Sequence, residues 1–412
     1  VKAGYLARLV IRRTLRLMRE LGLALPLADL VEMQIQRLDY SDWQERFVTV
    51  KEILDQEEQK YAETLEKGKR LVKKTAEHFK KMGQPIPLVE MISLYDTHGI
   101  PPEIARESAE EMGAAVELPD NFYSLVAKKR IKAEAEEVAK VVLSGKTELL
   151  FYEHPFEEVF EAQVLDVTED GCAILDKTLL YPEGGGQPAD HGTLEKAGQV
   201  FQVVDVQKSG DVVLHKLDAP AGLAKGDRVT GKVDMRRRLA HARHHTATHL
   251  VHDSAKRVLG KHVWQAGAQK SEDRARLDIS HYKRITDAEL KAIELEANRR
   301  VMEVTPVDTQ FLPRTEAEKL FGFELYQGGV PPGKMIRVVQ VGTDIEACAG
   351  THVTNTGMIG AIKILRAERI QDGVERIEFA AGEAAVRASQ ERDDLLSGAA
   401  NVLRVPNDQL PK

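Results

Sequence analysis

The first 146 residues carry apolar side chains at every third or fourth position over long stretches. The segments YLARLVIRRTLRLMREL and VKEILDQEEQKYAETLEKGKRLVKK show this spacing, and a similar segment runs over residues 122–142. Such a period places the apolar side chains on one face of an α-helix. We therefore predict an all-helical region over residues 1–146.

The pattern changes near Phe151, where apolar and polar residues begin to alternate. The segments FEAQVLDVTEDGCAILDKTLLYPEGGGQ and FQVVDVQKSGDVVLHKLDA alternate in this way and are divided by Asp-Gly and Ser-Gly pairs. Alternation is typical of strands with one buried face, and such pairs favour turns. The pattern predicts a small β-barrel over residues 150–235, with a β-sandwich as the alternative.

Helical and strand-like segments then follow one another over residues 236–385. The segment DMRRRLAHARHHTATHLVHDSAKRVLG returns to helical spacing and ends on Gly260, which is a common stop signal. RVVQVG, AIKILRAERI and VERIEFAAG have the character of strands. We predict an α+β unit here and the start of a further helical region over residues 386–412. The predicted fold class is multidomain α+β.

Charge is distributed unevenly along the chain. The 412 residues contain 58 lysines and arginines against 65 aspartates and glutamates, a formal net charge of -7, which argues against a globally basic nucleic-acid-binding protein. The first twenty residues nevertheless carry six basic side chains: Lys2, Arg8, Arg12, Arg13, Arg16 and Arg19. Local charge rather than the total attracts a phosphate backbone. We predict that this segment contacts nucleic-acid phosphates, and the alternative is a solvated helix face.

Apolar run lengths and cysteine content bear on the cellular location. No run approaches the roughly 18 apolar residues of a membrane helix, so no membrane association is expected. The two cysteines, Cys172 and Cys348, cannot form a disulfide framework and suit a reducing compartment. The sequence therefore predicts a cytoplasmic protein.

Two histidines stand four residues apart in the segment HHTATHL. Residues four apart share one face of a helix, so His245 and His249 can reach the same ion. Much further along the chain, CAGTH supplies Cys348 and His352 at the same spacing. Three nitrogen donors and one thiolate sulfur match the preference of zinc. The four side chains predict a zinc site.

Other interpretations of these residues stay open. Cys348 could act as a nucleophile with His352 as its base, although ligand spacing accounts for all four residues at once. His241 and His252 lie on nearly the same helical face as the predicted ligands and are rival ligands. His244 points elsewhere and is expected to be exposed.

Three consecutive glycines follow a strand-like segment in YPEGGGQPADHG. Glycine lets backbone N–H groups come close to a phosphate or a ribose, because no side chain stands in the way. A hairpin turn is the alternative interpretation. The loop is therefore a candidate for close approach to a ligand.

Four segments occur in an order that resembles the editing domain of alanyl-tRNA synthetases: YPEGGGQPADHG, HHTATHLVH, RLDISHY and CAGTHVTNTGMIGAIKI. The segments VKAGYLARLVIRRTLR, EEQKYAETLEKG and LYDTHGIPPE resemble the helical tRNA-recognition region of the archaeal type. The resemblance covers nearly all of the chain. It implies a helical tRNA-recognition region, a β-barrel and a zinc-binding editing domain, with the aminoacylation domain missing in front and the C-terminal oligomerisation domain missing behind.

The resemblance implies binding of tRNA(Ala) and hydrolysis of mischarged Ser-tRNA(Ala) or Gly-tRNA(Ala), because a pocket sized for alanine cannot reject serine or glycine by binding alone. Aminoacylation is expected to reside in the missing N-terminal domain, and homodimers are expected only through the missing C-terminal domain. The alternative is a tRNA-docking module with a purely structural zinc. A free-standing editing deacylase and a threonyl-tRNA synthetase editing domain are disfavoured by the helical region and by the YPEGGGQ and LYDTHG segments.

The resemblance also implies roles for individual residues. Gln265 in HVWQAG is expected to align the aminoacyl group or a water molecule, and the hydroxyls of Thr246 and Thr248 are expected to take part beside the metal. Whether the Zn²⁺ is catalytic or architectural stays open. The residues expected to contact tRNA are Asp96, Arg8, Arg12, Arg13, Arg16, Gly184, Gly185, Gly186 and Gln187.

Overall fold

The computed structural model divides the chain into two compact units, residues 1–139 and 140–412. The described residues are 2–37, 44–98, 100, 102–119, 122, 145–331 and 333–410. The helix predicted over residues 122–142 lies outside them, apart from Phe122.

The described part of the first unit is helical, as its spacing predicts. The helices are α1 (Lys2–Glu20), α2 (Leu27–Arg37), α3 (Gln44–Met82), α4 (Leu88–His98) and α5 (Pro102–Glu111). Apolar side chains of α1, α2 and the first part of α3 form one buried cluster that includes Leu15, Met18, Leu27 and Tyr61. The second part of α3 packs with α4 and α5 in another cluster that includes Val72, Ala76, Met91 and Ile100. The long helix α3 thus contributes side chains to two separate apolar clusters.

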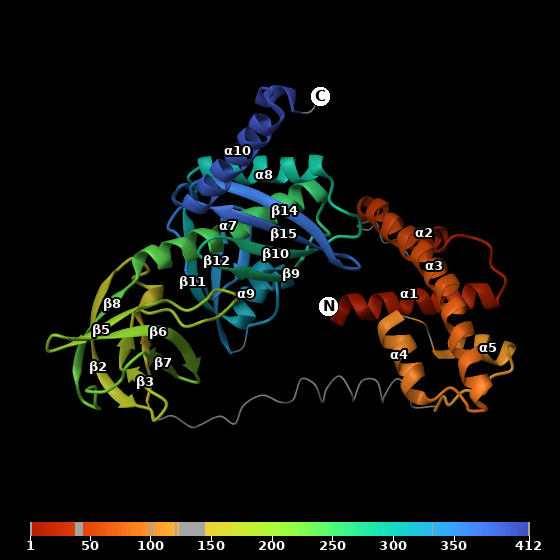
Figure 1. The fold of residues 1–412 in the computed structure, drawn as a ribbon, viewed down its shortest axis with the longest axis horizontal. Coiled ribbons are helices and arrows are strands. Elements are labelled where there is room, and N and C mark those ends of the chain that lie inside the picture. Colours follow the sequence, from red (N-terminus) through yellow and green to blue (C-terminus); the bar gives the residue numbers. More distant parts are fainter. Residues whose placement is uncertain are drawn as a thin grey trace. The chain divides into compact units, whose positions relative to one another are not determined.

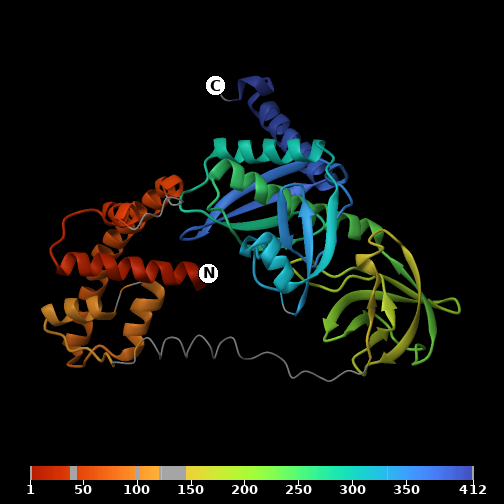
Figure 2. The same ribbon diagram turned by 180° about the vertical axis from the view of Figure 1, so that it is seen from behind.

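The second unit begins with a closed barrel of six antiparallel strands (yellow to green in Figures 1 and 2). Its strand order is β2 (Val159–Val167), β3 (Cys172–Leu175), β7 (Val212–Leu217), β6 (Gln199–Ser209), β5 (Gly192–Lys196) and β8 (Arg228–Val233). Before the barrel, β1 (Glu148–Leu149) pairs in parallel with β4 (Lys177–Thr178). Gly231 leaves room for Phe160 inside the barrel, since a Cβ atom there would lie 2.3 Å from the ring. The predicted barrel is confirmed.

A fully buried histidine in the barrel makes its stability depend on pH. His215 contacts the Thr178 hydroxyl through Nε2 (2.8 Å) and the Ala173 carbonyl through Nδ1 (3.0 Å). Burial lowers the pKa of His215 from 6.5 to about 4. In the unfolded chain His215 becomes protonated below its ordinary pKa of 6.5, whereas in the folded chain it stays neutral until the pH falls to about 4. Since a tenfold difference in proton affinity is about 1.4 kcal/mol, about 3 kcal/mol of stability is lost over this interval.

We expect His215→Gln to flatten the pH dependence of the unfolding free energy between pH 7 and pH 4. Urea unfolding of both proteins at several pH values measures this difference, and contributions from all other groups cancel in the comparison. Parallel curves for the two proteins would contradict the assignment to His215.

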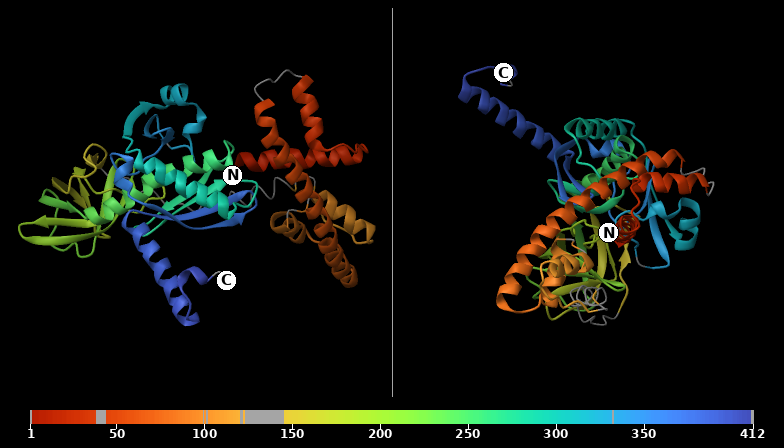
Figure 3. Two further views of the ribbon diagram at one scale, coloured as in Figure 1. Left: turned by 90° about the horizontal axis from the view of Figure 1, so that it is seen from above. Right: turned by 90° about the vertical axis from the view of Figure 1, so that its right-hand side faces the viewer.

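After the barrel, α7 (Met235–Leu259) and α8 (Asp287–Met302) pack against a four-stranded antiparallel sheet (Figures 1 and 3). The sheet order is β14 (Ile362–Gln371), β15 (Val374–Ala381), β10 (Ala275–Ser280) and β9 (Gln265–Lys270). The side chain of Asp234 caps the first turn of α7, and the helix ends at Gly260, as predicted. A single apolar core fills the space between the two helices and the sheet.

A smaller sheet completes the region and carries the second half of the predicted zinc site. Its order is β11 (Val307–Pro313), β12 (Met335–Val341) and β13 (Asp344–Ala347), with α9 (Arg314–Phe321) beside it. The helix α10 (Glu383–Leu403) then extends away from the four-stranded sheet (Figure 3). The coarse order of a helical region, a barrel and an α+β region is therefore confirmed. Within the described residues, no helix combines the length and the apolar character needed to cross a membrane.

Candidate metal centre

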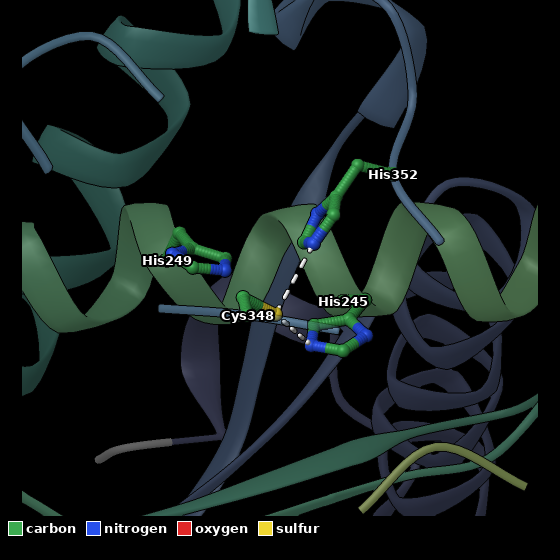
Figure 4. A group of neighbouring side chains, drawn as sticks. All are labelled: His245, His249, Cys348 and His352. Carbon is green, nitrogen blue, oxygen red and sulfur yellow. Dashed lines mark hydrogen bonds between the residues drawn. The ribbon is translucent and has the colours of Figure 1, made fainter. Parts of the chain in front are cut away.

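Four potential ligands from two distant segments meet beside α7. His245 and His249 project from adjacent turns of α7, Cys348 follows β13, and His352 lies in the loop after it (Figure 4). Their ligand atoms all lie within 4.8 Å of one another. The Cys348 sulfur is 3.2 Å from His245 Nε2 and 3.3 Å from His352 Nε2.

Two of the donor distances suit a tetrahedral ion. Zinc bonds of about 2.0–2.3 Å place neighbouring ligand atoms of a tetrahedron about 3.3–3.8 Å apart. The two sulfur–nitrogen distances are close to that range. The structure thus contains a buried His/Cys cluster that could bind a metal ion. The rival ligands His241 and His252 are not members of it.

Each histidine of the cluster is held through Nδ1 by an oxygen of another side chain. The pairs are His245 with Gln187 (2.8 Å), His249 with Asp344 (2.7 Å) and His352 with Thr246 (3.2 Å). When the protonated Nδ1 donates a hydrogen bond to such a partner, Nε2 of a neutral imidazole keeps a free lone pair that can bind an ion. These contacts orient all three imidazoles, and for His245 and His352, whose partners are uncharged, they leave Nε2 free to bind an ion.

Charged groups around the cluster favour the thiolate form of Cys348 and the protonated form of His249, which must lose its Nε2 proton to bind a cation. Burial lowers the pKa of His249, but the Glu346 and Asp344 carboxylates outweigh it and the pKa is raised well above its ordinary value. Burial raises the pKa of the Cys348 thiol, yet His249 and the buried Lys270 bring it below its ordinary value. The thiolate needed for metal binding is therefore favoured.

Gly350 is required by the close packing of the cluster. A Cβ atom at this position would lie 1.9 Å from His245 Cε1 and 3.0 Å from the Gln187 side-chain oxygen. No side chain fits in that space without moving the imidazole. The glycine in CAGTH therefore allows His245 to stand beside the segment that carries Cys348.

Sequence reasoning missed the two carboxylates behind the cluster. Asp344 and Glu346 are buried, and Glu346 contacts His252 Nδ1 at 2.8 Å. Both occur in DIEAC, where alternate positions of a strand carry acids directly before Cys348. Two acids on one face of a strand before a predicted ligand are a signal that could have indicated them.

The three residues predicted to be catalytic lie in different surroundings. Thr246 and Thr248 are buried in α7, where their hydroxyls donate to the carbonyls of Ala242 (2.9 Å) and His244 (2.8 Å). Gln265 is partly buried at the opposite end of β9 from Lys270. The catalytic roles of the three residues stay predictions.

The glycine loop packs against protein. Gly186 has a φ of 71°, and a Cβ atom there would lie 2.1 Å from the Ala268 carbonyl oxygen of β9. Lys270 donates to the carbonyls of Gly186 through its backbone N–H (2.8 Å) and of Gly185 through Nζ (3.0 Å). The side chain of Gln187 is fully buried, and the predicted contacts of the loop with tRNA stay predictions.

His244 is also placed differently from the prediction. It is buried, its Nδ1 lies 2.9 Å from the Ala240 carbonyl, and its Nε2 accepts a hydrogen bond from the Ala381 N–H. The expected exposure was wrong because α7 is covered on more than one side.

The basic residues of α1 divide into two groups. Arg8 and Arg12 face α3, where their guanidinium groups lie 3.0 and 3.9 Å from the Glu57 carboxylate. Arg13 is exposed, and Arg16 pairs with Glu20 on the same helix at 2.8 Å. Asp96 lies in α4, and its side chain is outside the description.

Comparisons with known proteins relate the chain to enzymes that act on tRNA. A family model described as tRNA synthetases class II (A) matches residues 1–237, and one described as threonyl and alanyl tRNA synthetase second additional domain matches residues 336–378. Alanine–tRNA ligases align over the whole chain, with 69% identity in Methanothrix thermoacetophila, 55% in Methanococcoides burtonii and 51% in Pyrococcus furiosus. The chain spans 45% of the first relative and 46% of the other two.

These matches overturn two expectations from the sequence. We expected the aminoacylation domain to be missing from this chain. The class II (A) match runs from residue 1 through the helical unit and the barrel, so the chain does carry class II tRNA synthetase sequence. The expected function, hydrolysis of mischarged tRNA by a chain without that region, is wrong for the same reason, and the matched relatives are ligases. Short motifs locate a site but do not define how far the family region around them extends.

Proposed function

Since this chain belongs to the alanine–tRNA ligases of the class II tRNA synthetases, we propose that it works as part of an enzyme that joins alanine to tRNA(Ala). Alignment of the whole chain to such ligases, at 51% to 69% identity, is the observation that supports this proposal. The cytoplasmic location expected from the two unpaired cysteines belongs to the same proposal.

Zn²⁺ is the metal that we propose for the cluster. Three imidazole nitrogens and one thiolate form a donor set that zinc prefers, and the spacing of the donor atoms suits a tetrahedron. When bound, an ion with four protein ligands cross-links the segments that supply them. In this chain it would connect α7 to the segment that follows β13.

The exposed basic side chains of α1 are proposed to contact the phosphate backbone of tRNA(Ala). Because Arg8 and Arg12 contact Glu57, Arg13 is the best candidate for a direct phosphate contact. Asp96 and the glycine loop stay predicted contacts.

Filter binding of tRNA(Ala) to the purified chain tests this proposal. We expect tRNA(Ala) to bind more tightly than a tRNA of another identity. Arg13→Ala should weaken binding. It should also make the decrease of the log association constant with log salt concentration less steep by about 0.9, because one phosphate contact is lost. The matched control is Lys291→Ala, which removes an exposed cation from α8 and should leave binding unchanged.

Two outcomes of that experiment count against the proposal. Equal binding of both tRNAs would overturn recognition of tRNA(Ala) by this chain. Unchanged affinity and salt slope in Arg13→Ala would overturn the assignment of α1 as the phosphate-binding face.

A further inference from the structure

Several hydrogen bonds fix the backbone of the glycine loop of the barrel. Gly184 and Gln187 exchange two backbone hydrogen bonds, of 3.1 and 2.9 Å, which close a tight turn. The Tyr181 hydroxyl donates to the Gly184 carbonyl at 3.1 Å, and Lys270 Nζ donates to the Gly185 carbonyl at 3.0 Å. These contacts fix the backbone from which the Gln187 side chain projects into the protein.

The buried amide of Gln187 makes three hydrogen bonds at the metal centre. Its oxygen lies 2.8 Å from His245 Nδ1 and accepts from the Thr351 backbone N–H at 3.1 Å. Its nitrogen donates to the Thr351 hydroxyl at 2.9 Å. Gln187 thus joins the histidine segment of α7 to the segment that carries Cys348.

The protonation of His245 follows from this arrangement. A backbone N–H can only donate, so the atom of Gln187 that faces Thr351 N must be the amide oxygen. The same oxygen faces His245 Nδ1, which must then carry the proton. His245 Nε2, 3.2 Å from the Cys348 sulfur, is left as a bare lone pair.

We propose that Gln187 is a positioning residue that selects the metal-binding tautomer of His245 and couples the order of the glycine loop to occupancy of the metal centre. The coupling follows because the imidazole has one position when it binds an ion through Nε2, and its Nδ1–H then holds the Gln187 oxygen. This inference rests on the proposed zinc site.

The affinity for Zn²⁺ and the visible spectrum of the Co²⁺-substituted chain test the tautomer role. Gln187→Leu should weaken Zn²⁺ binding about 10–100-fold, the usual cost of losing a partner of a metal-bound histidine, and should change the Co²⁺ absorption bands. Gln187→Glu should restore both, since a carboxylate also accepts from Nδ1–H. Gln202→Leu removes an exposed glutamine of the barrel and serves as the matched control.

Hydrogen–deuterium exchange of residues 183–191 tests the coupling. In the unmodified chain, removal of zinc by a chelator should speed exchange in this loop, and Gln187→Leu should show fast exchange whether or not zinc is present. Should Gln187→Leu fail to fold, the chelator arm and Gln187→Glu still decide the question.

The outcomes separate this inference from the proposed metal site. An unmodified chain that binds neither Zn²⁺ nor Co²⁺ would refute the metal site itself. If it binds zinc, but Gln187→Leu binds equally well, or exchange in the loop ignores the metal, then the role of Gln187 is refuted and the site stands.

Discussion

Cys348→Ala is expected to reduce the zinc content of the purified chain from one ion to a trace. The thiolate is one of the four proposed ligands, and its negative charge would offset part of the charge of an ion in a buried position. The loss of affinity should exceed the roughly 10–100-fold that follows from losing an outer partner of a ligand. Elemental analysis after dialysis, with competition by a chelator for the dissociation constant, measures both quantities.

Cys172→Ala is the matched control for this experiment. The chain has two cysteines, and Cys172 lies in β3 of the barrel, outside the cluster. This variant should keep its zinc. Retention of zinc by Cys348→Ala would contradict the assignment of Cys348 as a ligand. The ion would then be expected at the neighbouring group of His249, Asp344 and Glu346, which could also hold a metal.

Asp190→Ala is expected to destabilise the second unit by about 3–5 kcal/mol, the usual effect of breaking a buried ion pair. Asp190 and Arg238 have no exposed side-chain surface, and the guanidinium Nε donates to the carboxylate at 2.8 Å. The same carboxylate accepts from the Tyr181 N–H at 2.7 Å, and Arg238 also donates to the Pro155 carbonyl at 2.8 Å. Without Asp190, a buried positive charge has no counterion. Urea unfolding followed by circular dichroism measures the change.

An exposed ion pair in the same unit provides the comparison. Asp273 lies 3.1 Å from Arg387, but its side chain is 83% exposed. Asp273→Ala should therefore cost at most about 1 kcal/mol. Similar losses in the two variants would show that the buried pair contributes no more than a solvated one.

The two predictions concern one surface of α7. Arg238 and His245 stand seven residues apart, close to two helical turns, and therefore share a face. Asp190 and Gln187, from one loop of the barrel, contact these two residues. An ion pair and a hydrogen bond to a proposed metal ligand thus hold the same loop against the same helix.

Part of this organisation was predictable because it depends on local spacing. A period of three to four residues predicted α1 and α3, and alternation predicted the barrel strands. The pair of histidines on one helix face and the pair in CAGTH were also evident, since both depend on positions four residues apart.

Other features could not be predicted because they depend on what packs against a segment. The glycine loop was expected to be a hairpin turn or to approach a ligand, and only the structure shows the tight turn and its packing against Ala268 in β9. In α7, His244 was expected to be exposed, yet it is buried because the barrel loop, both sheets and the region after β13 cover the helix. Periodicity predicts which face of a helix is buried only when one side is covered.

By itself, the sequence determined the types and order of the elements, the chemical nature of the four proposed ligands and the four-residue spacing within each pair, because these are set by neighbours along the chain. Only the tertiary structure decided that the two pairs meet, that Gln187, Asp344 and Thr246 hold the imidazoles, and that Arg238 finds Asp190. Such contacts join segments far apart in sequence, and no local pattern records which distant atoms folding will bring within hydrogen-bonding distance.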